Sequence, residues 1–245
     1  MILPAEDDAA LTYLCAKERL AGEVGIDVER SPLETGGTEE LLRRIRKLGR
    51  DPTVSGILVE APLPLGIDAG AMRDALPLEK DVDGAGSASL GRLAAGHPCF
   101  VPATAAAVLA LLDGERIEVA GQRVTIVGRS LVVGRPLALL LLARDATVTV
   151  CHSKTKDVGA VARASDIVCV AVGRPRFLTG QMVQPGAVVI DVGTNWVAGR
   201  LVGDVDFDSV GQTAGAISPV PGGVGPLTTT ILLEQVADAA EAAGR

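Results

Sequence analysis

A glycine-containing segment in the middle of the chain has the composition of an anion-binding turn. The β-branched run 124–127 leads into Gly128-Arg129-Ser130, and Gly134 follows after three intervening residues. A strand, a glycine turn and a helix N-terminus can together bind a diphosphate, because glycines let the backbone approach and free N–H groups attract negative charge. The spacing departs from GxGxxG, since Ser130 replaces the second glycine and one extra residue precedes Gly134. A tight structural turn explains lone glycines about as often, so the segment alone leaves both interpretations open.

Polar residues follow the next β-branched run, 147–151, in the order His152-Ser153-Lys154-Thr155. An NAD enzyme usually has an acid at this place, which binds the ribose hydroxyl. Here no carboxylate would repel a phosphate, and Arg129, Ser153 and Lys154 could hold a 2′-phosphate by charge-assisted hydrogen bonds. Surface polarity at a strand end is the alternative. Arg129 in the adjacent loop favours NADP over NAD as the cofactor.

A third segment, 217–228, contains three prolines and three glycines between a short apolar run and a helix. Such a segment has little conformational freedom to lose and can present backbone groups to a ligand. A plain loop would need fewer special residues. The composition therefore favours a binding site but names no ligand.

The elements that must position these segments form a repeating α/β pattern. From residue 124 onward, β-branched runs at 124–127, 147–151, 167–172 and 188–192 alternate with segments rich in Gly, Ala and Leu. Residues 134–144 predict a helix that is apolar almost all round. Right-handed crossovers would place the strands in a parallel, doubly wound sheet.

The first half has its own α/β pattern. We expect a helix from residue 9 or 10 to 24, a helix at 38–48 with Thr38 as N-cap, and a strand at 55–59. Further helices are expected at 104–112 and 227–243, and Asp113-Gly114 marks a domain boundary. The sequence thus predicts an α/β fold with two domains, one of residues 1–112 completed by 227–245, and one of residues 113–226.

Composition excludes some classes of protein. Aromatic residues make up only 2 % of the 245 residues, so the core must consist of Val, Leu, Ile and Ala, as in helix-covered parallel sheets. A net charge of −7 argues against nucleic-acid binding, which needs clustered Lys and Arg. The basic stretch at 43–47 lies beside Glu39 and Glu40, which indicates a solvated helix face.

Cysteine and histidine usage indicates no metal site. Four cysteines form no CxxC pair, and the two histidines are not at metal-ligand spacing, so we expect reduced, mostly buried thiols without zinc or disulfides. The first residues lack the basic and apolar regions of a signal peptide, and no run is long enough to span a bilayer. We therefore expect a cytoplasmic protein.

Ordered motifs run through nearly the whole chain. They are Gly56-Ile57-Leu58-Val59-Glu60-Ala61-Pro62-Leu63-Pro64, Lys80-Asp81-Val82-Asp83-Gly84, the segment from Val127 to Pro136, His152-Ser153-Lys154-Thr155, Val189-Ile190-Asp191-Val192-Gly193, Gly203-Asp204-Val205 and the segment from Pro219 to Thr228. In this order they resemble the signature segments of the methylenetetrahydrofolate dehydrogenase/cyclohydrolase family. Agreement of several long motifs by chance is implausible, although any one of them alone would be weak.

The resemblance implies two domains that face each other across a cleft, a folate-binding domain and a Rossmann domain that binds NADP. It also implies a homodimer, the usual state of the family. Tyr13 and Lys17 match a Tyr-x-x-x-Lys pair, and positions four apart share one face of a helix. Without the family, such a pair is an ordinary helix surface. Asp83 matches a carboxylate that accepts the paired N–H donors of the pterin, although it could also be a turn residue. The remaining matched positions are Pro221, Gly222 and Gly223 for the substrate, and Gly128, Arg129, Ser130, Gly134, His152, Ser153 and Thr194 for the cofactor.

The chain departs from the family pattern at three places. The family begins with some thirty further residues, so we expect a shortened N-terminus or a late start. A Pro-Cys-Thr-Pro segment corresponds to Pro102-Ala103-Thr104-Ala105, which loses the second proline. A glutamine of the folate site corresponds to Glu60.

Glu60 bears on the cyclohydrolase step, in which the resemblance gives Lys17 the acid/base work. A carboxylate in contact with Lys17 would favour the charged ammonium, which cannot take a proton from water. The catalytic candidates are therefore Tyr13, Lys17 and Glu60. We expect the protein to oxidise methylenetetrahydrofolate with NADP, because hydride transfer needs mainly positioning. We expect its cyclohydrolase activity to be weak or absent. The alternatives are a divergent NADP-dependent reductase of another one-carbon substrate and a non-catalytic nucleotide-binding paralogue.

Overall fold

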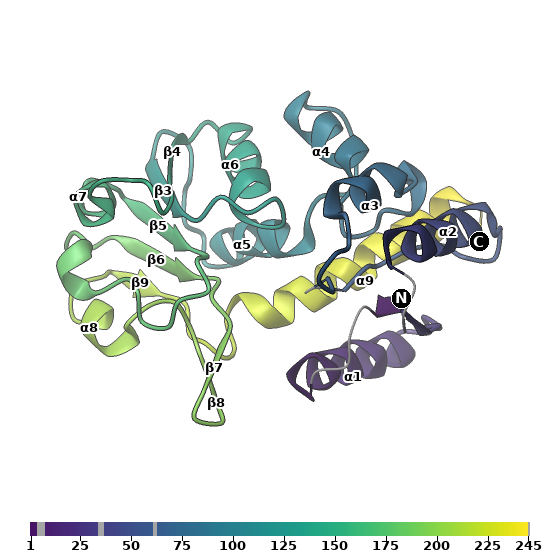
Figure 1. The fold of residues 1–245 in the computed structure, drawn as a ribbon. Helices are drawn as coiled ribbons and strands as arrows, with labels where there is room; N and C mark the ends of the chain where they lie inside the picture. The colour runs from purple at the N-terminus through teal and green to yellow at the C-terminus, as the bar shows by residue number, and fades with distance from the viewer. Residues whose placement is uncertain (4–7, 34–36, 61–62, 245) are drawn as a thin grey trace. The chain divides into compact units, whose positions relative to one another are not determined.

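The structure is a computed structural model that describes residues 1–245 except 4–7, 34–36, 61–62 and 245. It divides into two compact units (Figure 1). The first contains Met1–Val101 and Thr229–Arg245, and the second contains Pro102–Thr228. The first boundary thus precedes the helix α5 (Ala103–Gly114), whereas the sequence suggested a boundary after it. This helix includes Asp113-Gly114 and ends there, two residues beyond the helix expected at 104–112.

The second unit is built on a parallel five-stranded sheet in the order β4-β3-β5-β6-β9. The strands are β3 (Arg123–Val127), β4 (Thr147–Cys151), β5 (Ile167–Val170), β6 (Val188–Asp191) and β9 (Ala216–Ile217). Val127 at the end of β3 pairs with Cys151 of β4 on one side and with Val170 of β5 on the other. The doubly wound α/β class expected from the sequence is confirmed.

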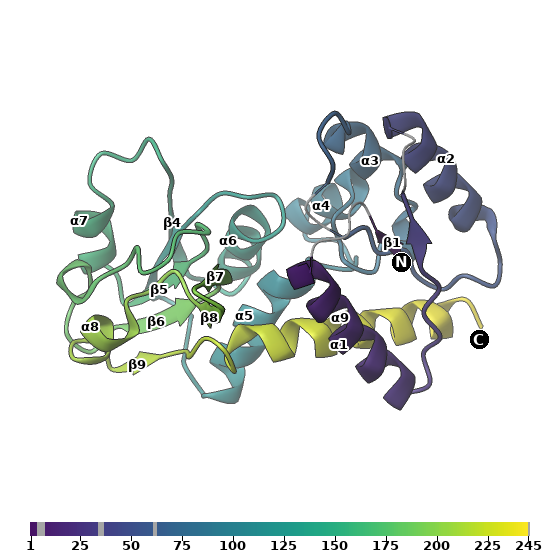
Figure 2. The same ribbon diagram turned by 60° about the horizontal axis from the view of Figure 1, so that its bottom comes forward.

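Helices cover both faces of this sheet (Figures 1 and 2). α5 and α6 (Gly134–Leu142) lie on one face, and α7 (Val158–Arg163) and α8 (Phe207–Gly211) lie on the other. Leu137 and Leu141 of α6 are fully buried, but Leu142 is 54 % exposed. The sequence predicted a helix with apolar residues almost all round, but one side of it faces solvent. The short 3₁₀ helix η2 (Gly180–Met182) connects β5 to β6.

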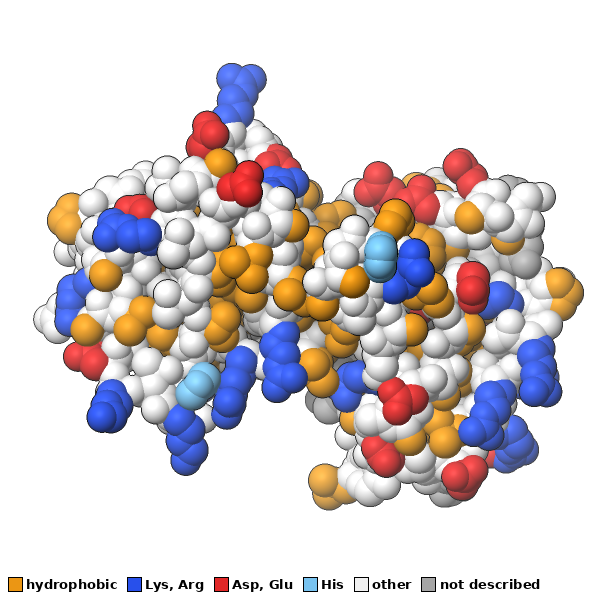
Figure 3. Space-filling model, turned by 90° about the horizontal axis from the view of Figure 1, so that it is seen from above, with side chains coloured by type: hydrophobic (Ala, Val, Ile, Leu, Met, Phe, Trp, Pro, Cys, Tyr) orange, Lys and Arg blue, Asp and Glu red, His pale blue; other side chains and the backbone are white. Residues whose placement is uncertain are grey.

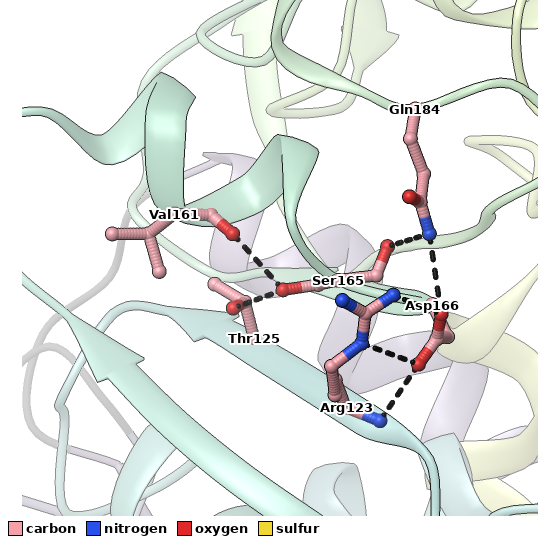
Figure 4. Close-up of polar contacts among 6 residues, drawn as sticks. All are labelled: Arg123, Thr125, Val161, Ser165, Asp166 and Gln184. Carbon is pink, nitrogen blue, oxygen red and sulfur yellow. Dashed lines mark hydrogen bonds and ion pairs between the residues drawn. The ribbon is translucent and has the colours of Figure 1, made fainter.

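Polar side chains fasten the amino edge of the sheet (Figure 4). Arg123 donates to Asp166 through Nε at 3.0 Å and Nη2 at 2.7 Å, and these bonds hold the pKa of Asp166 well below its usual range. Gln184 donates to the same carboxylate at 3.2 Å. Behind this group, the buried hydroxyls of Thr125 and Ser165 are 2.6 Å apart. The starts of β3 and β5 are thereby held together.

An antiparallel hairpin of β7 (Asn195–Val197) and β8 (Arg200–Val202) projects from the carboxyl edge of the same sheet. Trp196 and Val197 on it are 50 % and 45 % exposed.

The first unit contains a small parallel sheet and several helices. β1 (Ile2–Leu3) pairs with β2 (Ser31–Pro32) and forms a single bridge from Ile2 to Val59. The strand expected at 55–59 is therefore reduced to this one bridge. The helices are α1 (Asp8–Glu23), α2 (Gly37–Arg50), α3 (Ala69–Ala75), the 3₁₀ helix η1 (Leu78–Lys80), α4 (Ser87–Ala94) and the part of α9 (Val224–Ala242) from residue 229 on.

The core of this unit is aliphatic, and one expected cap is wrong. Ile2, Leu41 and Ile45 are fully buried in a cluster with Ile57 and Met72. Thr38 lies inside α2, and its hydroxyl accepts the N–H of Asp68 at 2.8 Å, so it links α2 to the start of α3 and does not cap α2.

All four cysteines are free. Cys151 and Cys169 are buried as expected, and burial raises the pKa of the Cys169 thiol to about 12. Cys15 is exposed, so the expectation of mostly buried thiols holds only for the strand cysteines. Within the described ranges, no helix combines the length and apolar character needed to cross a membrane.

Candidate functional site

The glycine turn after β3 is shaped by two close backbone approaches. Gly128 has a φ of 129°, and a Cβ there would lie 2.2 Å from the carbonyl oxygen of Ala171 after β5. A Cβ on Gly134 would lie 2.2 Å from the carbonyl oxygen of Gly128. Side chains at either position would force the turn open. The turn therefore brings bare backbone to the first turn of α6, as a diphosphate site requires.

Ser130 and Arg135 organise the same turn. The Ser130 hydroxyl accepts the N–H groups of Val133 at 3.0 Å and Gly134 at 3.4 Å, at the start of α6. Arg135 Nε donates to the carbonyl oxygen of Arg129 at 3.2 Å. Ser130 is thus a support of the loop, and the guanidinium groups of Arg129 and Arg135 are both exposed beside a helix N-terminus.

A tight polar turn follows β4. The backbone N–H of His152 donates to Thr155 Oγ1 at 2.9 Å, and the N–H of Lys154 donates to His152 Nδ1 at 3.1 Å. Since Nδ1 accepts, a neutral His152 ring has its proton on Nε2. Ser153 and Lys154 are exposed. The turn offers donors and positive charge but no carboxylate.

These turns lie at the carboxyl edge of one sheet, because β3, β4, β5 and β6 are parallel. On the face of the molecule that Figure 3 shows, Lys and Arg side chains gather beside a histidine at the lower margin of the left part. In a doubly wound sheet, ligands bind outside this edge where the strand order reverses, here between β3 and β5. Thr194 is exposed after β6 on the same edge.

Two buried acids at this edge were not assigned from the sequence. Asp191, the last residue of β6, and Asp204 are 4 % and 0 % exposed. Burial raises the pKa of Asp191, against the effect of the backbone N–H groups that it accepts. Their positions in the sequence could have indicated them, since Asp191 directly follows an apolar run and Asp204 directly follows Gly203, both within the family motifs. Their hydrogen-bond partners could not be found from sequence.

In the first unit, the structure brings together two of the catalytic candidates. Lys17 on α1 donates from Nζ to Oε1 of Glu60 at 2.5 Å, and the two side chains are 20 % and 23 % exposed. Glu60 is held by its backbone N–H, which donates to the carbonyl of Ile2 at 3.0 Å. Tyr13 lies on α1, one helical turn before Lys17, but its side chain is outside the described residues.

The turn that contains Asp83 is fixed by its neighbours. Asp81 is buried, and its carboxylate accepts the N–H of Ala85 at 3.0 Å, the N–H of Gly86 at 2.9 Å and the Ser89 hydroxyl at 2.5 Å. Burial raises the pKa of Asp81, while these bonds oppose the shift. Gln235 of α9 donates to the carbonyl of Val82 at 2.9 Å. Asp83 itself is half-buried.

Lys80, the first residue of the same motif, has a structural position. Its Nζ donates to the carbonyl oxygens of Leu48 at 3.1 Å and Asp51 at 2.6 Å, at the end of α2. In this motif, Lys80 and Asp81 thus stabilise the turn, and Asp83 is the residue that the turn presents.

The proline- and glycine-rich loop lies between β9 and α9 in the second unit. Pro221 and Gly222 are exposed, whereas Gly223 is buried, and the Val220–Pro221 peptide bond is cis. The helix begins at Val224, three residues earlier than expected. The exposed part of the loop can present its backbone to a ligand.

A parallel doubly wound sheet with a glycine turn at its switch point defines a dinucleotide-binding protein of the Rossmann class. The family described as "Tetrahydrofolate dehydrogenase/cyclohydrolase, NAD(P)-binding domain" matches residues 102–244, and the family described as "Tetrahydrofolate dehydrogenase/cyclohydrolase, catalytic domain" matches residues 1–83. The chain belongs to the tetrahydrofolate dehydrogenase/cyclohydrolase family, as the sequence motifs indicated.

Individual relatives agree with this assignment. The chain is 53 % identical over 240 residues to the "Bifunctional protein FolD" of Parafrankia sp., which covers 98 % of this chain and 87 % of the relative. The bifunctional 5,10-methylenetetrahydrofolate dehydrogenase/cyclohydrolase of Thermoplasma acidophilum is 46 % identical, with a TM-score of 0.92 over 99 % of this chain and 88 % of that one. The Trypanosoma brucei enzyme, complexed with NADP and inhibitor, is 38 % identical, with a TM-score of 0.93 over 100 % and 86 % of the two chains.

Proposed function

We propose that this chain oxidises 5,10-methylenetetrahydrofolate to 5,10-methenyltetrahydrofolate with NADP, and that Glu60 slows the cyclohydrolase step that follows. The family membership supports both reactions. The observation that carries the dehydrogenase step is the bare-backbone turn of Gly128 and Gly134 at the switch point of the sheet.

The residues of the second unit fit NADP. The backbone between Gly128 and Gly134 holds the diphosphate, with Ser130 supporting the loop. Arg129, Ser153 and His152 bind the 2′-phosphate, since the turn 152–155 contains no acid that would repel it. Thr194 contacts the other half of the cofactor. When bound, NADP supplies the hydride acceptor.

The folate is bound by groups from several segments. Asp83 accepts the N–H donors of the pterin, and the fixed turn around it keeps the carboxylate in place before the substrate arrives. Pro221, Gly222 and Gly223 present backbone to the substrate. Tyr13 and Lys17 contact the reacting part of the folate, and Lys17 provides a positive charge there.

The Lys17–Glu60 contact is what we expect to reduce hydrolysis. Both side chains are mostly buried, and opposite charges attract more strongly away from bulk water. Lys17 Nζ is engaged by Glu60 Oε1 at 2.5 Å, and an amine held in an ion pair is a poorer acceptor of a proton from the attacking water. Hydride transfer needs no such base, so it is affected much less.

A cofactor-reduction assay tests the dehydrogenase. Purified protein is mixed with methylenetetrahydrofolate and NADP or NAD, while nucleotide binding is measured in parallel. We expect reduction with NADP. Binding of NADP without turnover would instead support the non-catalytic paralogue, and turnover only with another one-carbon substrate would support the divergent reductase.

The proposal that Glu60 slows the cyclohydrolase step is tested by measuring hydrolysis of methenyltetrahydrofolate by the Glu60→Gln variant. Freeing Lys17 should raise the rate by at least about tenfold, because a working general base contributes at least that much. Glu18→Gln is the matched control, since Glu18 lies on α1 but pairs with Arg30, and it should leave the rate unchanged. No gain in Glu60→Gln would defeat the proposal.

We also propose a homodimer and a cytoplasmic location. The exposed Trp196 and Val197 on the hairpin support an interface, because large apolar side chains grouped on a projecting element favour association. Trp196→Arg should shift the mass measured by light scattering from dimer to monomer. An unchanged mass would remove the hairpin from the interface.

A further inference from the structure

Asp204 gathers backbone donors from the loop after β5. Its Oδ2 accepts the N–H of Val172 at 2.6 Å and of Gly173 at 2.9 Å, and its Oδ1 accepts the N–H of Arg174 at 2.7 Å. Oδ1 also accepts Nδ2 of Asn195, the first residue of the hairpin, at 2.9 Å. One buried carboxylate thus fixes three successive residues of a loop and the start of another segment.

Asp191 extends this network to the end of β6. Its Oδ1 accepts the N–H of Gly193 and of Asp204, each at 2.9 Å, and its Oδ2 accepts the N–H of Val205 at 3.0 Å. Among the described residues, no ion pair is formed by Asp191 or Asp204, so the negative charges are stabilised by N–H dipoles alone. The two acids connect the loops after β5 and β6 in series.

The strand order tells which part of a dinucleotide these loops meet. In the order β4-β3-β5-β6-β9, the glycine turn follows β3, the turn of His152 follows β4 on one side, and the loops after β5 and β6 lie on the other. A dinucleotide whose diphosphate lies on the glycine turn has its adenosine half toward β4. Its nicotinamide half therefore lies toward residues 172–174 and 193–195.

We propose that Asp204, supported by Asp191, is a positioning residue that holds the loops after β5 and β6 in the shape that receives the nicotinamide half of the cofactor. This inference rests on the proposed NADP site. Neither acid touches the cofactor. Both fix backbone groups in advance, so the bound nicotinamide meets a surface that needs no rearrangement.

The hydrogen-bond pattern makes Asp204→Asn a sharp test. All four donors point at the two carboxylate oxygens, and an asparagine has only one oxygen acceptor. Whichever way the amide turns, its NH₂ group faces N–H donors on one side. The loop must then move, although the side chain keeps its size.

The readout is the affinity for two ligands, NADP and 2′,5′-ADP, which contains only the adenosine half with its phosphates. Asp204→Asn should weaken NADP binding by at least about tenfold, since each unsatisfied buried donor costs about that factor. Binding of 2′,5′-ADP should stay unchanged. A general loss of structure would instead weaken both ligands.

Two variants complete the test. Asp166→Asn, at the opposite edge of the sheet, removes a structural carboxylate and should leave both affinities unchanged. Asn195→Ala removes only one donor, leaves the Asp204 carboxylate intact, and should weaken NADP selectively but less than Asp204→Asn.

The outcomes separate the inference from the proposed function. If wild-type protein binds neither ligand, the nucleotide site itself is wrong. If wild type binds both, the inference is overturned when Asp204→Asn and Asn195→Ala weaken the two ligands equally or leave NADP binding intact. If Asp204→Asn does not fold, Asn195→Ala decides by the same comparison.

Discussion

Carboxylates stand at both edges of the five-stranded sheet, and they have different partners. At the amino edge, Asp166 is partly exposed and pairs with the guanidinium of Arg123. At the carboxyl edge, Asp191 and Asp204 are buried, and within the described part of the chain their donors are N–H groups of backbone and amide. An acid paired with a flexible cation fastens two strands, whereas an acid that gathers N–H groups determines the shape of loops. Ligand binding should therefore depend on one edge and stability on both.

The largest effect is expected from Gly128→Ala at the carboxyl edge. The new Cβ would collide with the carbonyl oxygen of Ala171, at a φ that side chains rarely adopt, and the turn must open. Since a displacement of about an ångström can cost about a hundredfold, NADP affinity should fall at least that much in a titration. Gly211→Ala, where a Cβ meets nothing within 4 Å, is the control and should bind normally. Normal binding by Gly128→Ala would mean that the turn does not hold the diphosphate.

Arg129→Ala should have the next largest effect, on the choice of cofactor. Loss of charge-assisted hydrogen bonds to the 2′-phosphate should weaken NADP by about tenfold to a hundredfold and leave NAD unaffected. The ratio of kcat/KM for the two cofactors measures this directly. Lys156→Ala removes the same charge near the end of β4 and serves as control. Equal losses for NADP and NAD would place Arg129 elsewhere on the cofactor.

Asp166→Asn should lower the Tm by only a few degrees, because a partly exposed pair is screened by solvent. Its KM for NADP should not change. A raised KM would break the division between the two edges, because it would show that the amino edge also shapes the site.

The smallest effect is a difference in the sign of pH dependence. The pKa of Asp166 is lowered in the folded protein, so its stabilisation is present above its unfolded value of about 4 and is lost as the pH falls below it. The pKa of Asp191 is raised, so ionisation costs stability as the pH rises from about 4 through the folded value. Denaturant unfolding across the acid range should show the stability gap between wild type and Asp166→Asn shrinking as pH falls. As the pH falls, the stability of wild type relative to Asp191→Asn should instead increase. If the stability differences of both variants changed with pH in the same way, the opposite pKa shifts of Asp166 and Asp191 would be contradicted.

Sequence patterns predicted most of the second unit, because its longer strands are β-branched runs, those of β3, β5 and β6 largely buried, and its turns contain glycine. They were less successful in the first unit. Residues 55–59 are apolar and β-branched enough to suggest a strand, yet the described pairing is a single bridge from Val59 to Ile2, since the neighbouring strand β1 has just two residues. Thr38 had the residue type of a cap but binds the backbone of Asp68 instead.

The candidate site shows the same limit. Contact between Lys17 and Glu60, which are 43 positions apart, was expected only through the family resemblance, and the structure contains it at 2.5 Å. The roles of Asp81, Asp191 and Asp204 as supports were not expected at all. Most of their partners are backbone N–H groups, which every residue type except proline has, so residue types could not reveal them.

By itself, the sequence determined the family, the order of the strands along the chain and the place of the glycine turn, because these depend on local periodicity and on residues with special backbone freedom. The tertiary structure alone decided which acids lie in the interior and which N–H groups they accept. The physical reason is that a buried charge must find its donors wherever the fold brings them, and for Asp204 three of the four come from a loop 30 to 32 positions earlier in the chain.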